Sequence, residues 1–420
     1  MSARLTVVGI GEDGWAGLSA RAQEALRGAT LVLGGARQLA LLPGDAVVAQ
    51  REAWPSPMLP RVEQLAAATT AGEPQIARTV VLGSGDPMLH GIGATLARLT
   101  DPALLDVLPV PSAYSLACAR LGWAQHEVPL VSLVADPQHD PLPALAGGRA
   151  IVYVPGRAGA RRLAALLRDA GLGGAQLTIL SRLGGEHEAR LDVTADEFDD
   201  DGDPLHLVAV DARGVVPAPE RRRLMSAVPG LPDALYGGDG QLTRAEPRAI
   251  ALAALAPSPG ELLWDVGAGS GTIAIEWCRA ASRARAVAIE RREDRCATIA
   301  GNARTLGASR VQVVCGELPG ALELLPALDA APDAIFIGGA TSQPGLIDRC
   351  WQALRPGGRL VASAVTFDSE QALIAAHRRF GGRLLRLAHD HAGMIGSFAA
   401  WTPQRPIVQW SAVKQEQGAA

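Results

Sequence analysis

The feature of this sequence that most constrains its fold is a run of three glycines, Gly267, Gly269 and Gly271, between a strand-like and a helix-like segment. Residues 262–266 form the apolar strand-like run, and residues 273–280 form the helix. Glycine permits a tight turn and a close approach of ligand to backbone. A strand, a glycine loop and a helix in this order are typical of nucleotide-binding α/β folds with parallel sheets.

Two nearby residues indicate which nucleotide this loop binds. The spacing is G-x-G-x-G, and Thr272 stands where a dinucleotide fingerprint has a third glycine or alanine. This departure favours S-adenosylmethionine over NAD. Glu290 ends the next strand about twenty residues further on, where a carboxylate can accept both ribose hydroxyls. We therefore predict a methyl-donor site in the second half of the chain.

Other residues of the second half are expected around this site. Asp265 is predicted to order the loop or to bind the methionine amine. Gly316 and Glu317 follow the next strand, where they would meet the adenine. Gly338 and its neighbour Gly339 replace the N/D-P-P-Y box of enzymes that methylate amino groups. The two glycines leave room for a flat, bulky substrate or simply form a turn.

The segment before the glycine loop contains a predicted helix start. Thr243 and Glu246 have the spacing of a capping box. Thr243 is also predicted to be one of the residues that bind the methyl donor. Arg244 and Arg248 are candidates for binding substrate carboxylates, because a guanidinium pairs with a carboxylate through two parallel hydrogen bonds. The alternative is that both are ordinary exposed helix arginines.

At this point the second half shows a specific resemblance. The motifs lie in one order at residues 230–233, 242–248, 265–271 and 336–339. They resemble the methyltransferases of corrin (vitamin B12) biosynthesis that methylate carbon 15 of the macrocycle and decarboxylate its carbon-12 acetate. The resemblance implies a class I Rossmann-like domain that binds S-adenosylmethionine.

The first half contains a second, different glycine pattern. Residues 9–14 match G-x-G-x-x-G after a strand, but no acidic residue ends the following strand, so an NAD site is weakly supported. Residues 82–93 and 110–115 resemble the two signature loops of the tetrapyrrole methylases, which hold S-adenosylmethionine between two α/β subdomains. The resemblance places seven residues at a donor pocket: Gly9, Gly11, Gly85, Asp86, Pro87, Ser112 and Ala113.

Some positions of the first half depart from the tetrapyrrole methylase pattern or allow two interpretations. Glu12 and Asp13 replace the common Pro-Gly, and residues 131–135 lack the His-Gly that often follows that strand. His90 has an imidazole that titrates near neutral pH and could act as a base, although a structural role in its glycine-rich loop is at least as plausible.

The two halves together suggest one enzyme. Four prolines and an arginine run predict a linker at residues 213–235, between a tetrapyrrole methylase domain at 1–212 and a class I domain at 236–420. The fusion resembles the precorrin-6Y C(5,15)-methyltransferase (decarboxylating) family. This implies methylation of carbons 5 and 15 of a precorrin, loss of the carbon-12 acetate carboxyl, precorrin-8X as product, and one S-adenosylmethionine site per lobe. The alternatives are a two-domain RNA methyltransferase and a tetrapyrrole carrier with one inactive lobe.

Composition excludes several other classes. The net charge is −4 without a long basic run, so nucleic acid is not expected as a partner. No apolar run reaches about 18 residues, and the first residues lack a leader pattern, so we expect a cytoplasmic protein without a membrane span. A homo-oligomer, with possible hand-over to neighbouring corrin-pathway enzymes, is also expected.

Cysteine and histidine spacing predicts no metal. The five cysteines lie far apart, which indicates small buried apolar side chains rather than metal ligands or a disulfide framework. His389 and His391 flank Asp390 and could suggest a metal, but this i,i+2 spacing without further ligands makes a metal site improbable.

Overall fold

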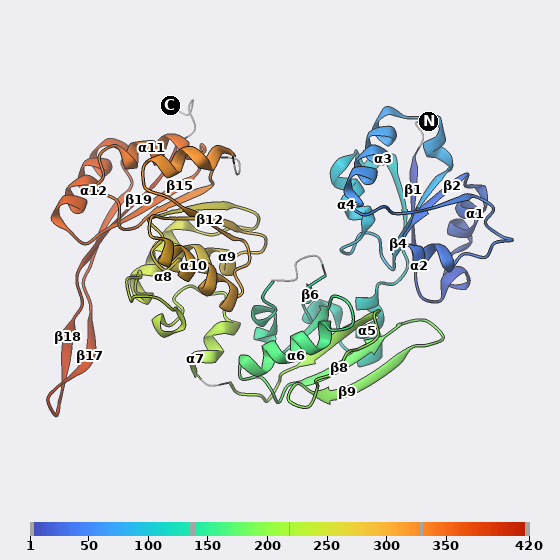
Figure 1. Ribbon diagram of the computed structural model, residues 1–420, viewed down its shortest axis with the longest axis horizontal. Helices are drawn as coiled ribbons and strands as arrows, with labels where there is room; N and C mark the ends of the chain where they lie inside the picture. The colour runs from blue at the N-terminus through green and yellow to red at the C-terminus, as the bar shows by residue number, and fades with distance from the viewer. Residues whose placement is uncertain (1–3, 135–138, 218, 328–330, 416–420) are drawn as a thin grey trace. The chain divides into compact units, whose positions relative to one another are not determined.

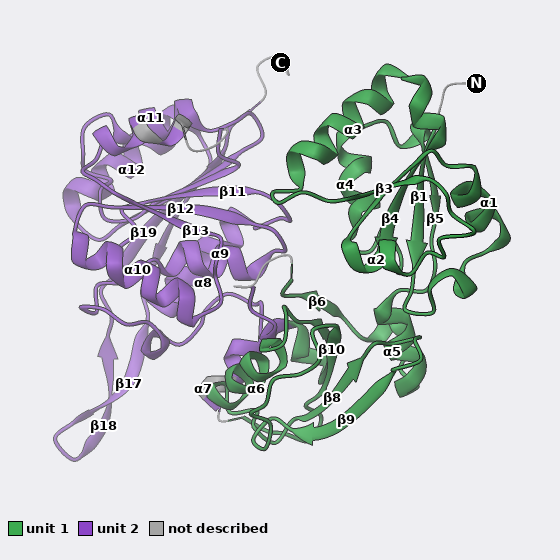
Figure 2. Ribbon diagram, turned by 45° about the vertical axis from the view of Figure 1, so that its right-hand side comes forward, with its two compact units in different colours: residues 1–137, 144–217 green, residues 138–143, 218–420 purple. Residues whose placement is uncertain are grey.

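The computed structural model describes residues 4–134, 139–217, 219–327 and 331–415. The chain divides into two compact units: unit 1 comprises residues 1–137 and 144–217, and unit 2 comprises 138–143 and 218–420 (Figure 2). Unit 2 thus includes most of the predicted linker. Within the described ranges, none of the helices combines the length and apolar character that a membrane crossing requires.

Unit 1 begins with a fully parallel sheet of strand order β3-β2-β4-β1-β5 (Figure 1). Alternate residues of β1 pack on opposite faces: Val8 joins a core with helices α1 and α2, whereas Val7 joins a core with α3 and α4. The strands are β1 (Leu5–Ile10), β2 (Leu31–Gly34), β3 (Gln50–Ala53), β4 (Thr79–Ser84) and β5 (Leu105–Leu108). The helices are α1 (Ala20–Gly28), α2 (Ala36–Ala40), α3 (Leu59–Ala71) and α4 (Ile92–Leu99).

The second sheet of unit 1 has the order β6-β7-β10-β8-β9. Only β6 and β7 are parallel, and the other pairs are antiparallel. The expected pair of α/β subdomains is confirmed, and this second sheet, unlike the first, is mostly antiparallel. The elements are α5 (Ala113–Leu121), β6 (Leu130–Ser132), β7 (Arg149–Tyr153), α6 (Gly159–Asp169), β8 (Gln176–Ser181), β9 (Ala189–Thr194) and β10 (His206–Asp211).

Unit 2 is built on a seven-stranded sheet of order β13-β12-β11-β14-β15-β19-β16. The order reverses beside β11, so the carboxyl ends of β11, β12 and β14 form the switch point at which α/β sheets bind ligands. The strands are β11 (Leu262–Val266), β12 (Arg285–Glu290), β13 (Val311–Cys315), β14 (Ala334–Ile337), β15 (Arg359–Ala364), β16 (Arg383–Leu387) and β19 (Ile407–Val413). The helices are α7 (Pro219–Arg222), α8 (Ala245–Leu255), α9 (Thr272–Ala280), α10 (Glu293–Thr305), α11 (Leu346–Ala353) and α12 (Phe367–Phe380).

The strand-like segments at residues 397–401 and 407–410 are neighbours in the sequence but do not pair with each other. β18 (Phe398–Pro403) pairs with β17 (Asp390–Ile395) in a separate two-stranded hairpin (Figure 1). β19 instead lies antiparallel between β15 and β16. β16 and β17 show no alternation of buried apolar and exposed polar residues, and β17 leaves Met394 and Ile395 exposed.

Candidate active sites

The glycine loop of unit 2 depends on its three glycines for its conformation. Gly267, Gly269 and Gly271 have φ values of +75°, +61° and +77°, which side chains with a Cβ rarely adopt. A Cβ on Gly271 would lie 2.7 Å from a side-chain carbon of Ile299. A Cβ on Gly338, at the end of β14, would lie 2.9 Å from the Gly267 carbonyl oxygen. The structure therefore brings the four glycines together at the carboxyl ends of β11 and β14.

Two buried carboxylates flank this loop. Glu290 Oε2 accepts a hydrogen bond from the Gly269 amide at 3.0 Å, while Oε1 accepts from the Arg291 and Arg292 amides at 3.0 and 3.1 Å. Asp265 Oδ2 accepts from the Ala274 amide of α9 at 3.0 Å. Burial, and after it the nearby Glu290 carboxylate, raises the pKa of Asp265 to about 7, against the hydrogen bond from Ala274.

The other oxygen of Asp265 points to a ligand. Oδ1 is buried without a hydrogen-bond partner in the described part of the chain. Buried acceptors are rarely left unpaired, because losing water without a replacement costs about 1–3 kcal/mol. The ammonium of S-adenosylmethionine would supply the missing donor, and Glu290 Oε2 keeps a lone pair for a ribose hydroxyl. The residues therefore fit this cofactor, with Thr272 buried at the first position of α9.

A residue that the sequence analysis missed holds the segment before α8 against this loop. Asn302 of α10 is buried, and its side-chain amide donates to the carbonyls of Ser270 and Gly237, both at 3.1 Å. Its Oδ1 accepts from the Gly237 amide at 2.8 Å. Asn302 thus joins the glycine loop to the segment before α8. Asn302 lies three residues after Ile299, and this helical spacing puts the two residues on one face. A polar residue on the same face as an apolar one was the signal available in the sequence.

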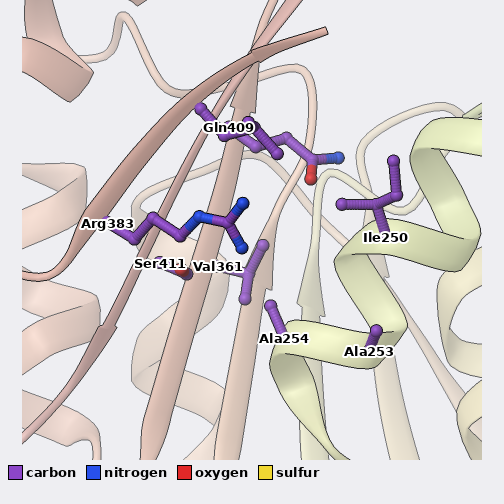
Figure 3. Close-up of a pocket in the computed structure, with 8 residues that line it drawn as sticks. Ile250, Ala253, Ala254, Val361, Arg383, Gln409 and Ser411 are labelled. Atoms are coloured by element: carbon purple, nitrogen blue, oxygen red, sulfur yellow. The ribbon is translucent and has the colours of Figure 1, made fainter.

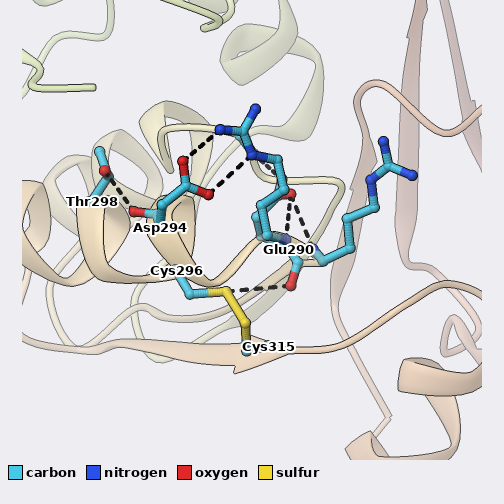
Figure 4. Close-up of a disulfide and its surroundings, with 8 residues drawn as sticks. Glu290, Asp294, Cys296, Thr298 and Cys315 are labelled. Carbon is cyan, nitrogen blue, oxygen red and sulfur yellow. Dashed lines mark hydrogen bonds and ion pairs between the residues drawn. A yellow bond between two sulfur atoms is a disulfide. The ribbon is translucent and has the colours of Figure 1, made fainter. Parts of the chain in front are cut away.

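A disulfide lies beside Glu290, which corrects the expectation for the cysteines. Cys296 of α10 and Cys315 of β13 are joined (Figure 4), whereas Cys118, Cys278 and Cys350 are buried and free. Spacing in the sequence does not show that β13 pairs with β12 beside α10. Gly316, next to the bridge, donates its amide to the Glu290 carbonyl at 2.9 Å, and Glu317 is exposed.

Arg248 does not have the predicted substrate-binding role in this structure. Its side chain is fully buried, and its Nε donates to Glu276 at 2.6 Å while Nη1 pairs with Asp233 at 3.1 Å. The remaining donors bond the carbonyls of Thr243 and Leu231. Because a buried guanidinium requires such partners, Arg248 instead anchors residues 231–233 to α8.

The neighbouring predictions on α8 have mixed outcomes. Arg244 is exposed and pairs with Asp233 at 3.3 Å, so its guanidinium stays accessible. The predicted capping box is wrong, because α8 begins at Ala245 with Arg244 as its N-cap and without a side-chain cap. Thr243 lies one residue too early to cap, and its carbonyl accepts from Arg248.

The candidate site of unit 1 is formed by three loops that are distant in sequence. A Cβ on Gly9 would lie 2.1 Å from the Gly85 carbonyl oxygen and 2.9 Å from the Val110 amide. A Cβ on Gly85 would lie 3.0 Å from Cα of Ser112 and 3.7 Å from the Ala113 amide. The ends of β1, β4 and β5 therefore meet backbone to backbone, as the family resemblance implies. Pro87 is buried against Gly9 and Gly83.

The polar residues of these loops mostly support the backbone. Ser112 caps α5 by accepting from the Ser115 amide at 3.0 Å. Asp86 accepts from the Met88 amide at 2.8 Å. Gly11 has Asp13 against it, since an added Cβ would lie 2.6 Å from the Asp13 carboxylate. His90 is exposed, with a left-handed φ of +55°, and its ring lies edge-on to that of Tyr153, with the ring centroids 6.4 Å apart.

A pocket of about 230 Å³ in unit 2 lies away from these loops. It is formed by the face of α8 that carries Ile250 and Ala254 and by the strands β15, β16 and β19 (Figure 3). Arg383 enters it from the beginning of β16, at the edge of the sheet opposite to the glycine loop. The pocket is therefore not part of the donor site.

Comparison with known proteins identifies both units. The family described as "Tetrapyrrole (Corrin/Porphyrin) Methylases" matches residues 4–199, and the "Precorrin methyltransferase domain" matches residues 234–414. The crystallised C-terminal domain of precorrin-6Y C5,15-methyltransferase from Rhodobacter capsulatus is 46% identical, covering 45% of this chain and 100% of that chain, with a TM-score of 0.42.

Similarity also extends over nearly the whole chain. Precorrin-6Y C(5,15)-methyltransferase [decarboxylating] from Mycobacterium tuberculosis is 44% identical, covering 98% of this chain and 100% of that protein. The protein of the same name from Sinorhizobium sp. is 43% identical, with 98% and 96% covered. The chain therefore belongs to the precorrin-6Y C(5,15)-methyltransferase (decarboxylating) family.

Proposed function

We propose that this chain methylates a precorrin at carbons 5 and 15 and removes the carboxyl group of its carbon-12 acetate, using one S-adenosylmethionine site in each unit. The product would be precorrin-8X. The observation that carries the proposal is the presence, in one chain, of two donor-site geometries, one around Asp265 and Glu290 and one around Gly9, Gly85 and Ser112. Unit 1 would act at carbon 5, and unit 2 would decarboxylate and act at carbon 15.

The chemistry requires positioning more than covalent catalysis. Bound S-adenosylmethionine supplies an electrophilic methyl group with its own leaving group, and an enamine-like carbon of the macrocycle is already nucleophilic. Good alignment contributes on the order of 7–11 kcal/mol to such a reaction. In unit 2, Asp265 and Glu290 would hold the two ends of the donor, while Gly339, where an added Cβ would meet no atom within 4 Å, leaves space beside it.

Substrate carboxylates need exposed cations near the donor loop. Arg244 meets this requirement, since its side chain is 55% exposed at the start of α8. Its partner Asp233 is also paired to Arg248, so Asp233 would keep a partner when Arg244 turns to a substrate. We therefore retain Arg244 as a substrate-binding candidate.

The number of donor sites can be counted directly. Calorimetry of the whole chain with S-adenosylhomocysteine should give two sites, and a turnover assay with labelled donor and reduced precorrin should give two methyl transfers and one carbon dioxide. A single saturable site would contradict the two-site proposal. Binding without transfer would favour the tetrapyrrole carrier, and transfer to RNA would favour the RNA methyltransferase.

We also propose that the protein is a cytoplasmic homo-oligomer that hands its product to a neighbouring corrin-pathway enzyme. Four large apolar side chains on the β17–β18 hairpin support self-association, because they are 65–77% exposed: Met394, Ile395, Phe398 and Trp401. Met394 and Trp401 lie on one face of the hairpin and Ile395 and Phe398 on the other, and large exposed apolar surfaces mark protein contacts. Sedimentation of the chain before and after Trp401→Lys would test the oligomer, whose loss is the expected result.

A further inference from the structure

Unit 2 contains a cluster of one carboxylate and two imidazoles outside the donor site. His391 Nε2 lies 3.2 Å from Glu246 Oε1, and His389 Nε2 lies 3.8 Å from Glu246 Oε2. One ligand atom of each residue lies within 4.8 Å of the others. The sequence shows only the His-x-His pair, and the fold brings the third residue from 143 positions earlier than His389, since 389 − 246 = 143.

The three side chains are held by different elements of one unit. Glu246 is the second residue of α8, His389 directly precedes β17, and His391 pairs with Thr402 of β18. The Gln404 amide donates to the His389 carbonyl at 2.9 Å, which closes the base of the hairpin. Gln409 of β19 donates to the Pro247 carbonyl at 2.9 Å, which ties the beginning of α8 to the same base. These contacts hold the backbone around the three side chains, of which His389 is 26% exposed and Glu246 and His391 are about half exposed.

We propose that Glu246, His389 and His391 bind a divalent transition metal ion such as Zn²⁺. Two imidazoles and one carboxylate are a common ligand set of zinc sites that keep a fourth position open. Zinc–ligand distances near 2.0–2.2 Å place tetrahedral ligands about 3.4 Å apart, close to the two separations above. His389 Nε2 is buried and has no hydrogen-bond partner among the described residues, which a metal ion would resolve.

The position of the cluster shows which elements a bound ion would connect. β16 ends at Leu387, which pairs with Ile407, and the adjacent Val408 pairs with Ala364 at the end of β15. The cluster therefore lies at the carboxyl edge of the parallel strands, the edge that also carries the glycine loop. A bound ion would join the first turn of α8 to the base of the β17–β18 hairpin.

Metal binding can be measured without reference to catalysis. The full chain, without an affinity tag and after chelator treatment, is titrated with ZnCl₂ by calorimetry, and bound metal is counted by elemental analysis. We expect one ion per chain with a micromolar or tighter Kd, and a rise in the melting temperature of unit 2. Glu246→Gln, His389→Ala and His391→Ala should each weaken binding at least tenfold.

The control is His126→Ala, which removes an imidazole that is 84% exposed and outside the cluster. It should bind Zn²⁺ like the unmodified chain, and circular dichroism should show that all four variants are folded. Absence of stoichiometric binding by the unmodified chain would overturn the proposal. Unchanged binding by Glu246→Gln would also overturn it, because the site would then lack its third ligand.

Discussion

The two candidate donor sites differ in how the chain builds them. In unit 2, Asp265, the glycine loop and Glu290 lie within 26 consecutive residues, 265–290, and buried carboxylates provide the polar groups. In unit 1, Gly9, Gly85 and Ser112 come from three distant strand ends, and backbone groups form most of the site. A site made of local side chains can be recognised from residue chemistry, whereas one made of backbone depends on close packing of glycines.

The largest expected effect is the loss of donor binding in unit 1, which tests whether close backbone packing forms that site. Gly9→Ala places a methyl group 2.1 Å from the Gly85 carbonyl oxygen, so the β1 and β4 loops must separate. We expect calorimetry with S-adenosylhomocysteine to show one site in place of two, and methylation at carbon 5 to be lost. Decarboxylation and methylation at carbon 15 should remain.

The matched control for Gly9→Ala is Gly28→Ala in α1. A Cβ on Gly28 would meet no atom within 4 Å, so this variant should keep both sites and be slightly more stable, because alanine favours the helix. Two intact donor sites in Gly9→Ala would show that the unit 1 site is not where the three loops meet.

The next largest effect is on stability, and it distinguishes the structural Arg248 from the substrate-binding candidate Arg244 in unit 2. Arg248→Ala leaves Glu276 buried without its cation, and breaking a buried pair in this way costs about 3–5 kcal/mol. Arg244→Ala removes an exposed pair and should change stability by less than about 1 kcal/mol. Chemical denaturation measures both.

The kinetic parameters complete the arginine test. We expect Arg244→Ala to raise the KM for the precorrin with little change in stability. If Arg248→Ala is as stable as the unmodified chain and raises KM instead, then the buried network does not have the structural role given to it here.

The same contrast explains which features the sequence predicts. The loop at Gly267, Gly269 and Gly271 and the acid at Glu290 are recognisable because their spacing is local and each residue type has a chemical reason. The α/β class follows from alternating strands and helices in the same way. The family resemblance, rather than spacing, locates Gly85 and Ser112.

Features that depend on distant packing could not be predicted. From the sequence, Arg248 could be a substrate-binding or an exposed helix arginine, and only the fold places Glu276 and Tyr236 around it. The Cys296–Cys315 bridge requires α10 to lie beside β13. Similarly, Glu246 joins His389 and His391 only after β16, β17 and β19 are in place.

A smaller effect is expected at Glu290, the carboxylate that is predicted to bind the ribose of the donor. Glu290→Gln removes the charge that would bind the ribose hydroxyls, and a hydrogen bond to a charged group contributes about 1.5–3 kcal/mol. The Kd for S-adenosylhomocysteine at the unit 2 site should therefore rise roughly 10- to 150-fold. The control Glu293→Gln, an exposed change three residues away, should leave the affinities of both sites unchanged. If Glu290→Gln weakened binding at the unit 1 site, then Glu290 could not be assigned to the unit 2 donor site alone.

The smallest effect is a pH dependence of donor affinity, which the unit 2 site should show and the unit 1 site should not. The pKa of Asp265 is raised to about 7, chiefly by burial, and an ammonium pairs with the ionised carboxylate. Affinity for S-adenosylhomocysteine in unit 2 should increase about tenfold between pH 6 and pH 8. Asp265→Asn should remove this dependence, and the unit 1 site should not follow it.

Stability should change with pH in the opposite direction in the free chain. Because the folded-state pKa of Asp265 lies above the unfolded value of 3.8, the folded chain binds more protons than the unfolded chain between these two values. The unfolding free energy of unit 2 therefore falls as pH rises from about 4 to about 7. Asp265→Asn should flatten this slope, and an identical slope in the variant would assign the pH dependence to another group.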